Sequence, residues 1–244
     1  MKTTRLFTII LFASLFIGVT TLSAGCHMRD LRGNGNVIKQ DRKISSFNEI
    51  EVSGAFEVFL KQGDVESITV EADENLMPYI RTEVVSGTLI IETKDNLFHH
   101  MTEMKVYITF KGLREIDLSG AVDLRTQNKL SLSDLKIDVS GASNANLDLA
   151  VQKLELDGSG ASKIFFKGSA VNVEMDLSGA SDIFAYDMPA ENYKIGISGA
   201  GKAEINVQKS LSAEISGAAS IKYKGSPATI DQEVSGAGTI KKVE

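Results

Sequence analysis

The sequence predicts an all-β protein built as a parallel β-helix, a solenoid with about 19–20 residues in each coil. The triplet Ser-Gly-Ala occurs eight times, and the last seven copies follow one another at intervals of 18 to 21 residues. Apolar residues fall at odd offsets from each serine, which is the period-two alternation of a β-strand with one buried face. A fixed period near 20 indicates one supersecondary unit stacked on copies of itself. The triplets begin at Ser53, Ser119, Ser140, Ser159, Ser178, Ser198, Ser216 and Ser235.

The N-terminus has the pattern of a lipoprotein signal peptide over residues 1–25. Lys2 and Arg5 precede an apolar stretch over residues 6–19, and small residues lead to Cys26, the only cysteine of the chain. We therefore expect removal of residues 1–25 and acylation of Cys26, for example with palmitate, which would tether the protein to a membrane. The residue three before the cysteine is Ser23, where a lipobox usually has an aliphatic side chain, so an ordinary secretory signal is the alternative. The apolar stretch is too short for a typical membrane-spanning helix.

The mature chain is acidic and has no second cysteine for a disulfide. Without Lys2 and Arg5, 24 basic side chains stand against 32 acidic ones. Nucleic-acid binding depends on neutralising phosphates with Lys and Arg, so this charge excludes nucleic acid as the expected partner. Residues 26–40 have few apolar side chains and several turn formers around Gly33 and Gly35, which predicts a flexible tether.

The segment 41–117 predicts an irregular N-terminal portion of the same β-stack. Residues 47–58 resemble one repeat, and strands are expected over residues 67–71, 88–92 and 105–110. A short helical turn is expected over residues 73–81, with Asp73 as a candidate N-cap. Residues 95–102 are expected to form a loop.

The segment 118–244 predicts the regular coils, each with two bends. Glycine accepts backbone angles that other residues avoid, so the Ser-Gly-Ala triplet is expected at one corner. The residues three after each serine are nearly all small, as expected where the interior narrows. Residues 167–169, 187–189 and 224–227 predict a second bend. An antiparallel sandwich is the structural alternative, but the Asn-Gly or Asp-Gly turns of its hairpins are missing between the repeats.

Several segments of the chain also resemble a known family. The residues concerned are 47–55 (FNEIEVSGA), 70–76 (VEADENL), 87–91 (GTLII) and the serial Ser-Gly-Ala corners. They are similar to the family called "putative auto-transporter adhesin, head GIN domain", and the resemblance covers roughly residues 43–240. It implies a right-handed parallel β-helix, often on a signal-bearing or lipid-anchored chain of the bacterial envelope. It supplies no catalytic residue and no cofactor.

One acidic row is the candidate site. Acidic side chains stand two positions before most of the serines, and strand parity places them on one outer face. Stacked carboxylates repel one another and can attract a cation. A weak calcium site and a face for cationic ligands are therefore the functional interpretations. The sequence favours a solvated acidic stripe, offset by serine hydroxyls and by Lys136, Lys163 and Lys194. The row consists of Asp117, Asp138, Asp157, Asp176, Glu214 and Glu233.

The sequence contains no recognisable catalytic set or cofactor motif. The acidic residues recur uniformly, whereas catalysis needs unlike groups gathered at one point. His99 and His100 could bind a metal together with Glu92 or Glu103, but a pair without function is the preferred interpretation. We therefore expect no catalytic residue, no cofactor and no metal.

The sequence thus predicts a non-enzymatic lipoprotein of the cell envelope that presents a β-helical surface in an adhesin-like role. Glycans or envelope proteins are its expected partners, and it would be lipid-anchored in the outer membrane with a periplasmic or a surface-facing orientation. The alternatives are a carbohydrate-active enzyme on the same scaffold and an envelope scaffold or stress component that assembles through the ends of its stack.

Overall fold

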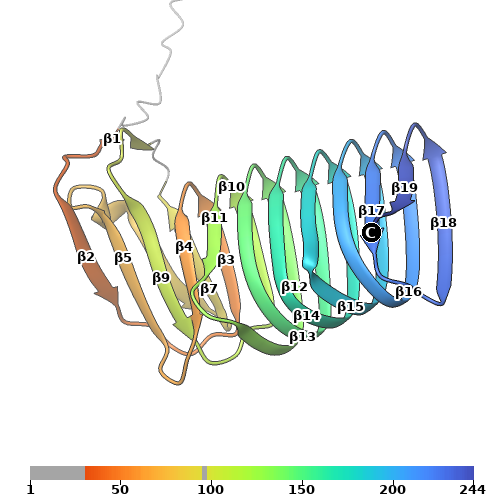
Figure 1. Ribbon diagram of the computed structural model, residues 1–244. Coiled ribbons are helices and arrows are strands. Elements are labelled where there is room, and N and C mark those ends of the chain that lie inside the picture. The colour runs from red at the N-terminus through yellow and green to blue at the C-terminus, as the bar shows by residue number, and fades with distance from the viewer. Residues whose placement is uncertain (1–30, 95–97) are drawn as a thin grey trace, which may run out of the picture.

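The computed structural model describes residues 31–94 and 98–244, and in them the chain forms a β-solenoid joined to an irregular N-terminal sheet (Figure 1). The predicted signal peptide and Cys26 lie outside the described residues. The regular coils consist of long, bent strands that each wrap around most of one coil. They are β12 (Leu130–Gly141), β13 (Asn144–Gly160), β14 (Lys163–Gly179), β15 (Asp182–Gly199) and β16 (Lys202–Gly217).

Shorter strands complete the solenoid at its two ends. They are β3 (Glu49–Gly54), β4 (Glu57–Gln62), β10 (Glu115–Gly120) and β11 (Asp123–Thr126) on the N-terminal side, and β17 (Ser220–Lys224), β18 (Thr229–Gly236) and β19 (Thr239–Lys242) on the C-terminal side. All the pairings between coils are parallel. The parallel β-helix predicted from the repeat is confirmed.

The eight serines of the triplets form one continuous row along the solenoid. Ser53 of β3 pairs directly with Ser119 of β10, although 66 residues separate them in the chain. The six remaining copies follow in unbroken register as far as Ser235. Residues between the first two coils therefore extend the stack on the N-terminal side of the first coil and then return to the next coil.

These residues form an irregular, partly antiparallel sheet that is continuous with the coils, so the expected irregular N-terminal portion of the stack is confirmed. β7 (Thr88–Thr93) and β9 (Met104–Phe110) pair parallel to β3 and β4, and they are followed outward by the antiparallel strands β6 (Ile80–Val85) and β5 (Ser67–Asp73). β2 (Val37–Arg42) pairs antiparallel with β5, so residues 37–40 belong to the sheet and not to a flexible tether. The expected strands over residues 67–71, 88–92 and 105–110 are confirmed.

Asp73 holds the start of the described chain against this sheet. Its buried carboxylate accepts hydrogen bonds from the backbone N–H groups of Gly35, at 2.7 Å, and Thr102, at 2.8 Å, and from the Thr102 hydroxyl, at 3.0 Å. Burial alone would raise the pKa of Asp73, but these hydrogen bonds outweigh it and lower the pKa. Asp73 is therefore not a helix cap: the short 3₁₀ helix η1 (Met77–Tyr79) follows Leu76 without a side-chain cap.

In the expected loop over residues 95–102, Phe98 and His99 form the short strand β8, which pairs with β1 (Leu31–Arg32).

The interior of the solenoid is filled by rows of apolar side chains. Leucine, isoleucine and valine dominate these rows, and Tyr193 is also fully buried, with its hydroxyl donating to the carbonyl of Met188 at 3.3 Å. Burial raises the pKa of Tyr193. Three serines, Ser143, Ser162 and Ser181, stack in the interior next to the corner. The prediction that small residues three after the triplet serine face inward is confirmed.

The corner glycines set the distance between coils. The glycines of all eight triplets have positive φ, and the alanines of the last seven triplets each donate the N–H to the glycine carbonyl one coil earlier, at 2.8–2.9 Å. A Cβ placed on Gly179 would lie 2.5 Å from the carbonyl oxygen of Gly160. The expected clash of a side chain at this corner is therefore against the neighbouring coil's backbone, and not in the interior.

The second bend is also visible in the backbone. Gly168 and Gly225 have positive φ, and the register of β15 shifts between Ala185 and Pro189, where Met188 turns into the core. Residues 167–169, 187–189 and 224–227 were expected at this bend.

We expect Gly179→Val to destabilise the solenoid by roughly 2 kcal/mol or more, because the new side chain meets the Gly160 backbone and φ is +100°. Thermal unfolding followed by circular dichroism measures the change. Gly112→Val is the matched control, since no atom lies within 4 Å of a Cβ at Gly112 and its φ is not positive. Equal melting temperatures for the two variants would contradict the role of the corner.

Candidate functional site

The predicted acidic row lies on one outer face of the solenoid, and the structure brings its members together. Each carboxylate residue pairs in register with the next coil, and the row is interrupted only at Gly196. With the neighbouring serines it lines a groove of about 590 Å³ that runs across successive coils. The side chains along the groove are Asp117, Asp138, Asp157, Asp176 and Glu214, with Ser140, Ser159, Ser178, Ser198 and Ser216 beside them. Glu233 continues the row on the last coil.

The local sequence explains why these groups lie in line. Strand residues alternate between the interior and the outer face, so the positions two before the serine and the serine itself both point outward. The hydroxyls of Ser140 and Ser178 point back along the stack, each 3.4 Å from a carbonyl oxygen of the preceding coil. At Gly196, Asp176 fills part of the vacant position, because its Oδ1 would lie 2.8 Å from a Cβ there.

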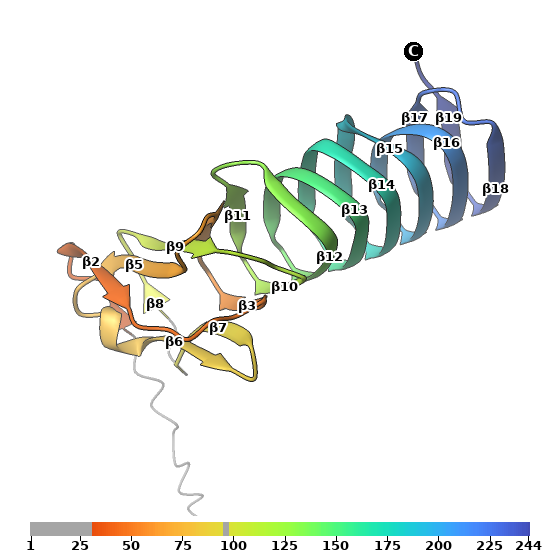
Figure 2. The ribbon, with the colours of Figure 1, turned by 90° about the horizontal axis from the view of Figure 1, so that it is seen from below.

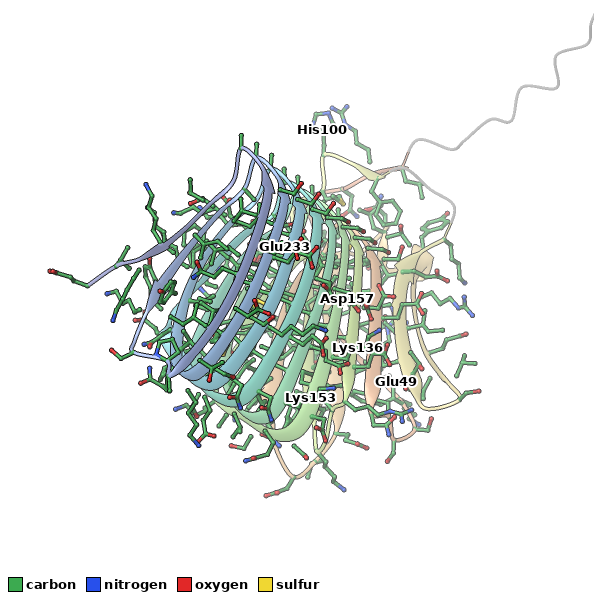
Figure 3. All side chains as sticks on the ribbon, turned by 90° about the vertical axis from the view of Figure 1, so that its right-hand side faces the viewer. Glu49, His100, Lys136, Lys153, Asp157 and Glu233 are labelled. Atoms are coloured by element: carbon green, nitrogen blue, oxygen red, sulfur yellow. The ribbon has the colours of Figure 1, made fainter. Side chains whose placement is uncertain are left out.

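Lys136 compensates part of the negative charge in the N-terminal part of the row. Lys136 Nζ lies 2.7 Å from Asp138 Oδ2, 3.6 Å from Glu115 Oε1 and 3.8 Å from Asp157 Oδ2 (Figure 3). The hydrogen bond to Asp138 raises the pKa of Lys136. Burial and the nearby Asp138 charge raise the pKa of both Asp117 and Asp157. The carboxylates therefore repel one another despite the lysine.

The other two lysines expected to offset the row have different partners. Lys194 pairs with Glu174 at 2.6 Å, outside the row, and Lys163 lies over the rings of Phe165 and Phe184. Among the described residues, Asp176, Glu214 and Glu233 have no ion-pair partner. Asp176 interacts with the charge of Lys194 at longer range, so Glu214 and Glu233 are the members of the row without a nearby cation in the described residues.

The row of carboxylates along the groove attracts positively charged groups. Within residues 31–94 and 98–244, no three His, Cys, Asp or Glu side chains form a group that could hold a metal ion. The carboxylates considered as partners for the His pair are already paired, Glu92 with Arg81 at 2.5 Å and Glu103 with Lys105 at 2.6 Å. His100 is exposed, with φ of 51°.

A second outer row was missed in the sequence. Phe165 and Phe184 pair in register and stack with ring centroids 4.7 Å apart, with Lys202 Nζ 4.9 Å from the Phe184 ring centre. The two rings face each other along the solenoid, so they stabilise neighbouring coils and present their edges outward. Both residues stand six positions after a triplet serine, which is the sequence signal that could have predicted the stack.

The fold and its outer faces define the protein as a parallel β-solenoid built from Ser-Gly-Ala coils, with one acidic groove. Residues 46–227 match the family described as "Putative auto-transporter adhesin, head GIN domain", and the chain belongs to this family. The family resemblance seen in the sequence is confirmed.

Solved structures of the same fold come from Bacteroides and Parabacteroides species. An adhesin-titled protein of Bacteroides fragilis is 26% identical, with a TM-score of 0.82 over 87% of this chain and 100% of that one. A protein of Parabacteroides distasonis described as a "Putative lipid binding protein" is also 26% identical, with a TM-score of 0.71 over 88% and 100% of the two chains. An adhesin-titled protein of Parabacteroides merdae is 25% identical, with a TM-score of 0.68 over 88% and 99%. A comparison with curated protein sequences found no match.

We expect Asp157→Asn to stabilise the fold at pH 7 by roughly a few tenths of a kcal/mol, since about half of this side chain is exposed and its repulsion is screened. The raised pKa of Asp157 means that the folded protein binds its proton more tightly than the unfolded chain does. The cost of its charge is therefore absent below the unfolded pKa, about 3.9, and grows as the pH rises through the folded pKa.

Denaturant unfolding of wild type and Asp157→Asn at pH 3 and at pH 7 measures this difference. Asp64→Asn, in an exposed loop, is the control and should leave the stability unchanged at both pH values. A larger gain for Asp157→Asn at pH 3 than at pH 7 would contradict the repulsion.

Proposed function

We propose that the protein is a non-enzymatic lipoprotein of the cell envelope that binds its partners through the outer face of the solenoid, in an adhesin-like role. The acidic groove is the observation that carries this proposal. It repeats the same carboxylate and hydroxyl groups on successive coils, which suits an extended partner with a matching repeat. Membership of the head GIN domain family supports an adhesin-like role as well.

The groove would recognise amine or guanidinium groups on a glycan or on an envelope protein. Adjacent coils place equivalent carboxylates about 4.8 Å apart, the spacing of neighbouring strands. Asp176, Glu214 and Glu233 form no close ion pair in the described chain, so a cationic partner would relieve their repulsion. The serine row beside them offers hydroxyls that could accept or donate hydrogen bonds to the same partner.

The uniformity of the groove supports binding over catalysis. A glycoside hydrolase needs an acid and a base or nucleophile in distinct environments at one bond. In this row the pKa is raised at both Asp117 and Asp157, in the same direction and by the same two main causes, which are burial and the charge of Asp138. The acidic row therefore contains no such asymmetric pair that would support a carbohydrate-active enzyme on this scaffold.

Anchoring through Cys26 would hold the N-terminal sheet close to the membrane. Five residue steps separate Cys26 from Leu31, the first residue of β1. At no more than about 3.6 Å per residue, the chain spans at most about 18 Å over this distance. The N-terminal sheet would then lie near the lipid surface, periplasmic or surface-facing, and the coils would extend from it. Within the described residues, no helix is long and apolar enough to cross a membrane.

We expect cells fed a palmitate analogue to label the wild-type protein and not Cys26→Ala, because the thiol is the acylation site. In a detergent phase separation, the wild type should also partition into the detergent phase. The same experiment with Cys26→Ala tests whether this partitioning depends on the acyl chain. Equal labelling of the two proteins would contradict lipid anchoring.

We expect the protein to bind immobilised poly-lysine or chitosan oligosaccharides more tightly than neutral dextran, and to lose this binding as salt is added. The double variant Asp176→Asn/Glu214→Gln should bind about tenfold more weakly, because two unpaired carboxylates are removed from the groove. Surface plasmon resonance measures both affinities.

The control for this experiment is Asp64→Asn/Asp187→Asn, which removes two exposed carboxylates outside the groove. It should bind as the wild type does. Equal binding by the groove variant and the control would exclude the groove as the binding site. Any shortened polysaccharide product in the same samples would contradict a non-enzymatic role.

A further inference from the structure

The C-terminal end of the solenoid leaves its core open. Ile230 and Val234 of β18 occupy inward-facing rows, yet they are 47% and 44% exposed. Their register partners one coil earlier, Leu211 and Ile215, are 1% and 0% exposed. Every residue of β18 is exposed. The inward row therefore continues to the last coil, where nothing in the described chain covers it (Figure 2).

The same end also leaves a backbone edge unpaired. β18 pairs only with β16, and β19 pairs only with β17, so in the described part of the chain the outer N–H and C=O groups of both strands have no strand beside them. At the other end, antiparallel strands β6, β5 and β2 follow the last parallel strands. An exposed edge of this kind is a template for another strand, and solenoids need a cover on each terminal coil.

The charges at the open end are divided between its two strands. β18 carries Asp231 and Glu233, and β19 carries Lys241 and Lys242. Among the described residues, Asp231, Glu233 and Lys241 have no ion-pair partner, while Lys242 Nζ lies 3.3 Å from the Ser226 hydroxyl. One strand is acidic and the other basic, so the end complements a copy of itself turned by 180°.

We infer that this end binds the same end of a second copy of the chain, with β18 of each copy pairing antiparallel to β19 of the other. The chain reverses direction at the corner formed by residues 235–238, so β18 and β19 run in opposite directions on the two sides of the coil (Figure 1). A two-fold axis parallel to the strands places β18 over the partner's β19 and makes the contact isologous. This inference goes beyond the proposed function and does not rest on it.

In this register, apolar residues face apolar residues and acidic residues face basic ones. The two-fold axis keeps the height of each residue, so residues equally distant along the chain from Ala237, within the corner, stand opposite each other. Val234 then faces Ile240 of the second copy, which extends the apolar interior across the junction. Glu233 faces Lys241, and two such pairs form by symmetry. The open core and both edge strands are covered at once.

The alternative two-fold arrangement pairs β18 with β18 and is disfavoured by charge. When Val234 of one copy is opposite Ile230 of the other, Asp231 of each copy stands opposite Glu233 of its partner. Like charges directly across an antiparallel pair destabilise it. The two arrangements therefore respond in opposite ways to a reversed charge at position 233.

Sedimentation velocity of the full-length protein in a density-matched detergent tests the inference. We expect the wild type to form dimers with increasing concentration. Glu233→Lys and Lys241→Glu should each weaken the dimer about tenfold or more, since attraction becomes repulsion at two sites. The double variant Glu233→Lys/Lys241→Glu should restore it. Asp64→Lys, the same charge reversal in the β4–β5 loop, should leave the dimer unchanged.

Melting temperatures of the variants check that each one folds. A wild type that remains monomeric over the whole concentration series overturns the inference. A dimer that Glu233→Lys leaves unchanged or strengthens overturns it as well, and strengthening identifies the β18–β18 arrangement. Failure of the folded double variant to restore the dimer excludes the proposed Glu233–Lys241 pair.

Discussion

The close approach of backbones at the Ser-Gly-Ala corner is the constraint on which the rest of the solenoid depends. The glycine carbonyl of one coil accepts a hydrogen bond from the alanine N–H of the next, from Gly54 and Ala121 to Gly217 and Ala237. A side chain at the glycine would occupy the place of that carbonyl. The corner therefore fixes the register of every coil, and the register in turn aligns the apolar rows inside and the polar rows outside. Even the long excursion after Ser53 returns to this register at Ser119.

The aligned outer rows give the molecule its surface chemistry. A residue type that recurs at one offset becomes a line of like groups, and carboxylates in such a line repel one another. Lys136 compensates part of this repulsion, whereas Glu214 and Glu233 are left without a nearby cation in the described residues. In the Phe165–Phe184 stack the same alignment is favourable, because stacked rings attract. The residue type at one position of the repeat thus determines the chemistry of a whole face of the solenoid.

The repeat made the coils and the acidic row predictable, because strand parity and a constant offset determine both. Two kinds of feature lay beyond this reasoning. The pairing of Ser53 with Ser119 joins segments 66 residues apart, and no local pattern signals which of the strands between them extend the stack on its N-terminal side. Similarly, residues 37–40 look like part of a linker because they follow the turn-forming run 33–36, yet β5 gives their backbone a partner. The role of Lys136 in the row was predicted, while Lys163 and Lys194 found nearer partners on other rows.

The constant register has a consequence for how such a chain can change length in evolution. Each coil contacts only its two neighbours, so duplication or loss of one 19-residue unit leaves the N-terminal sheet and the last coil with the surfaces they already have. Each added unit would lengthen the body by about 4.8 Å. The distance between its two ends can therefore be adjusted in small, equal steps, independently of the groups that each end presents.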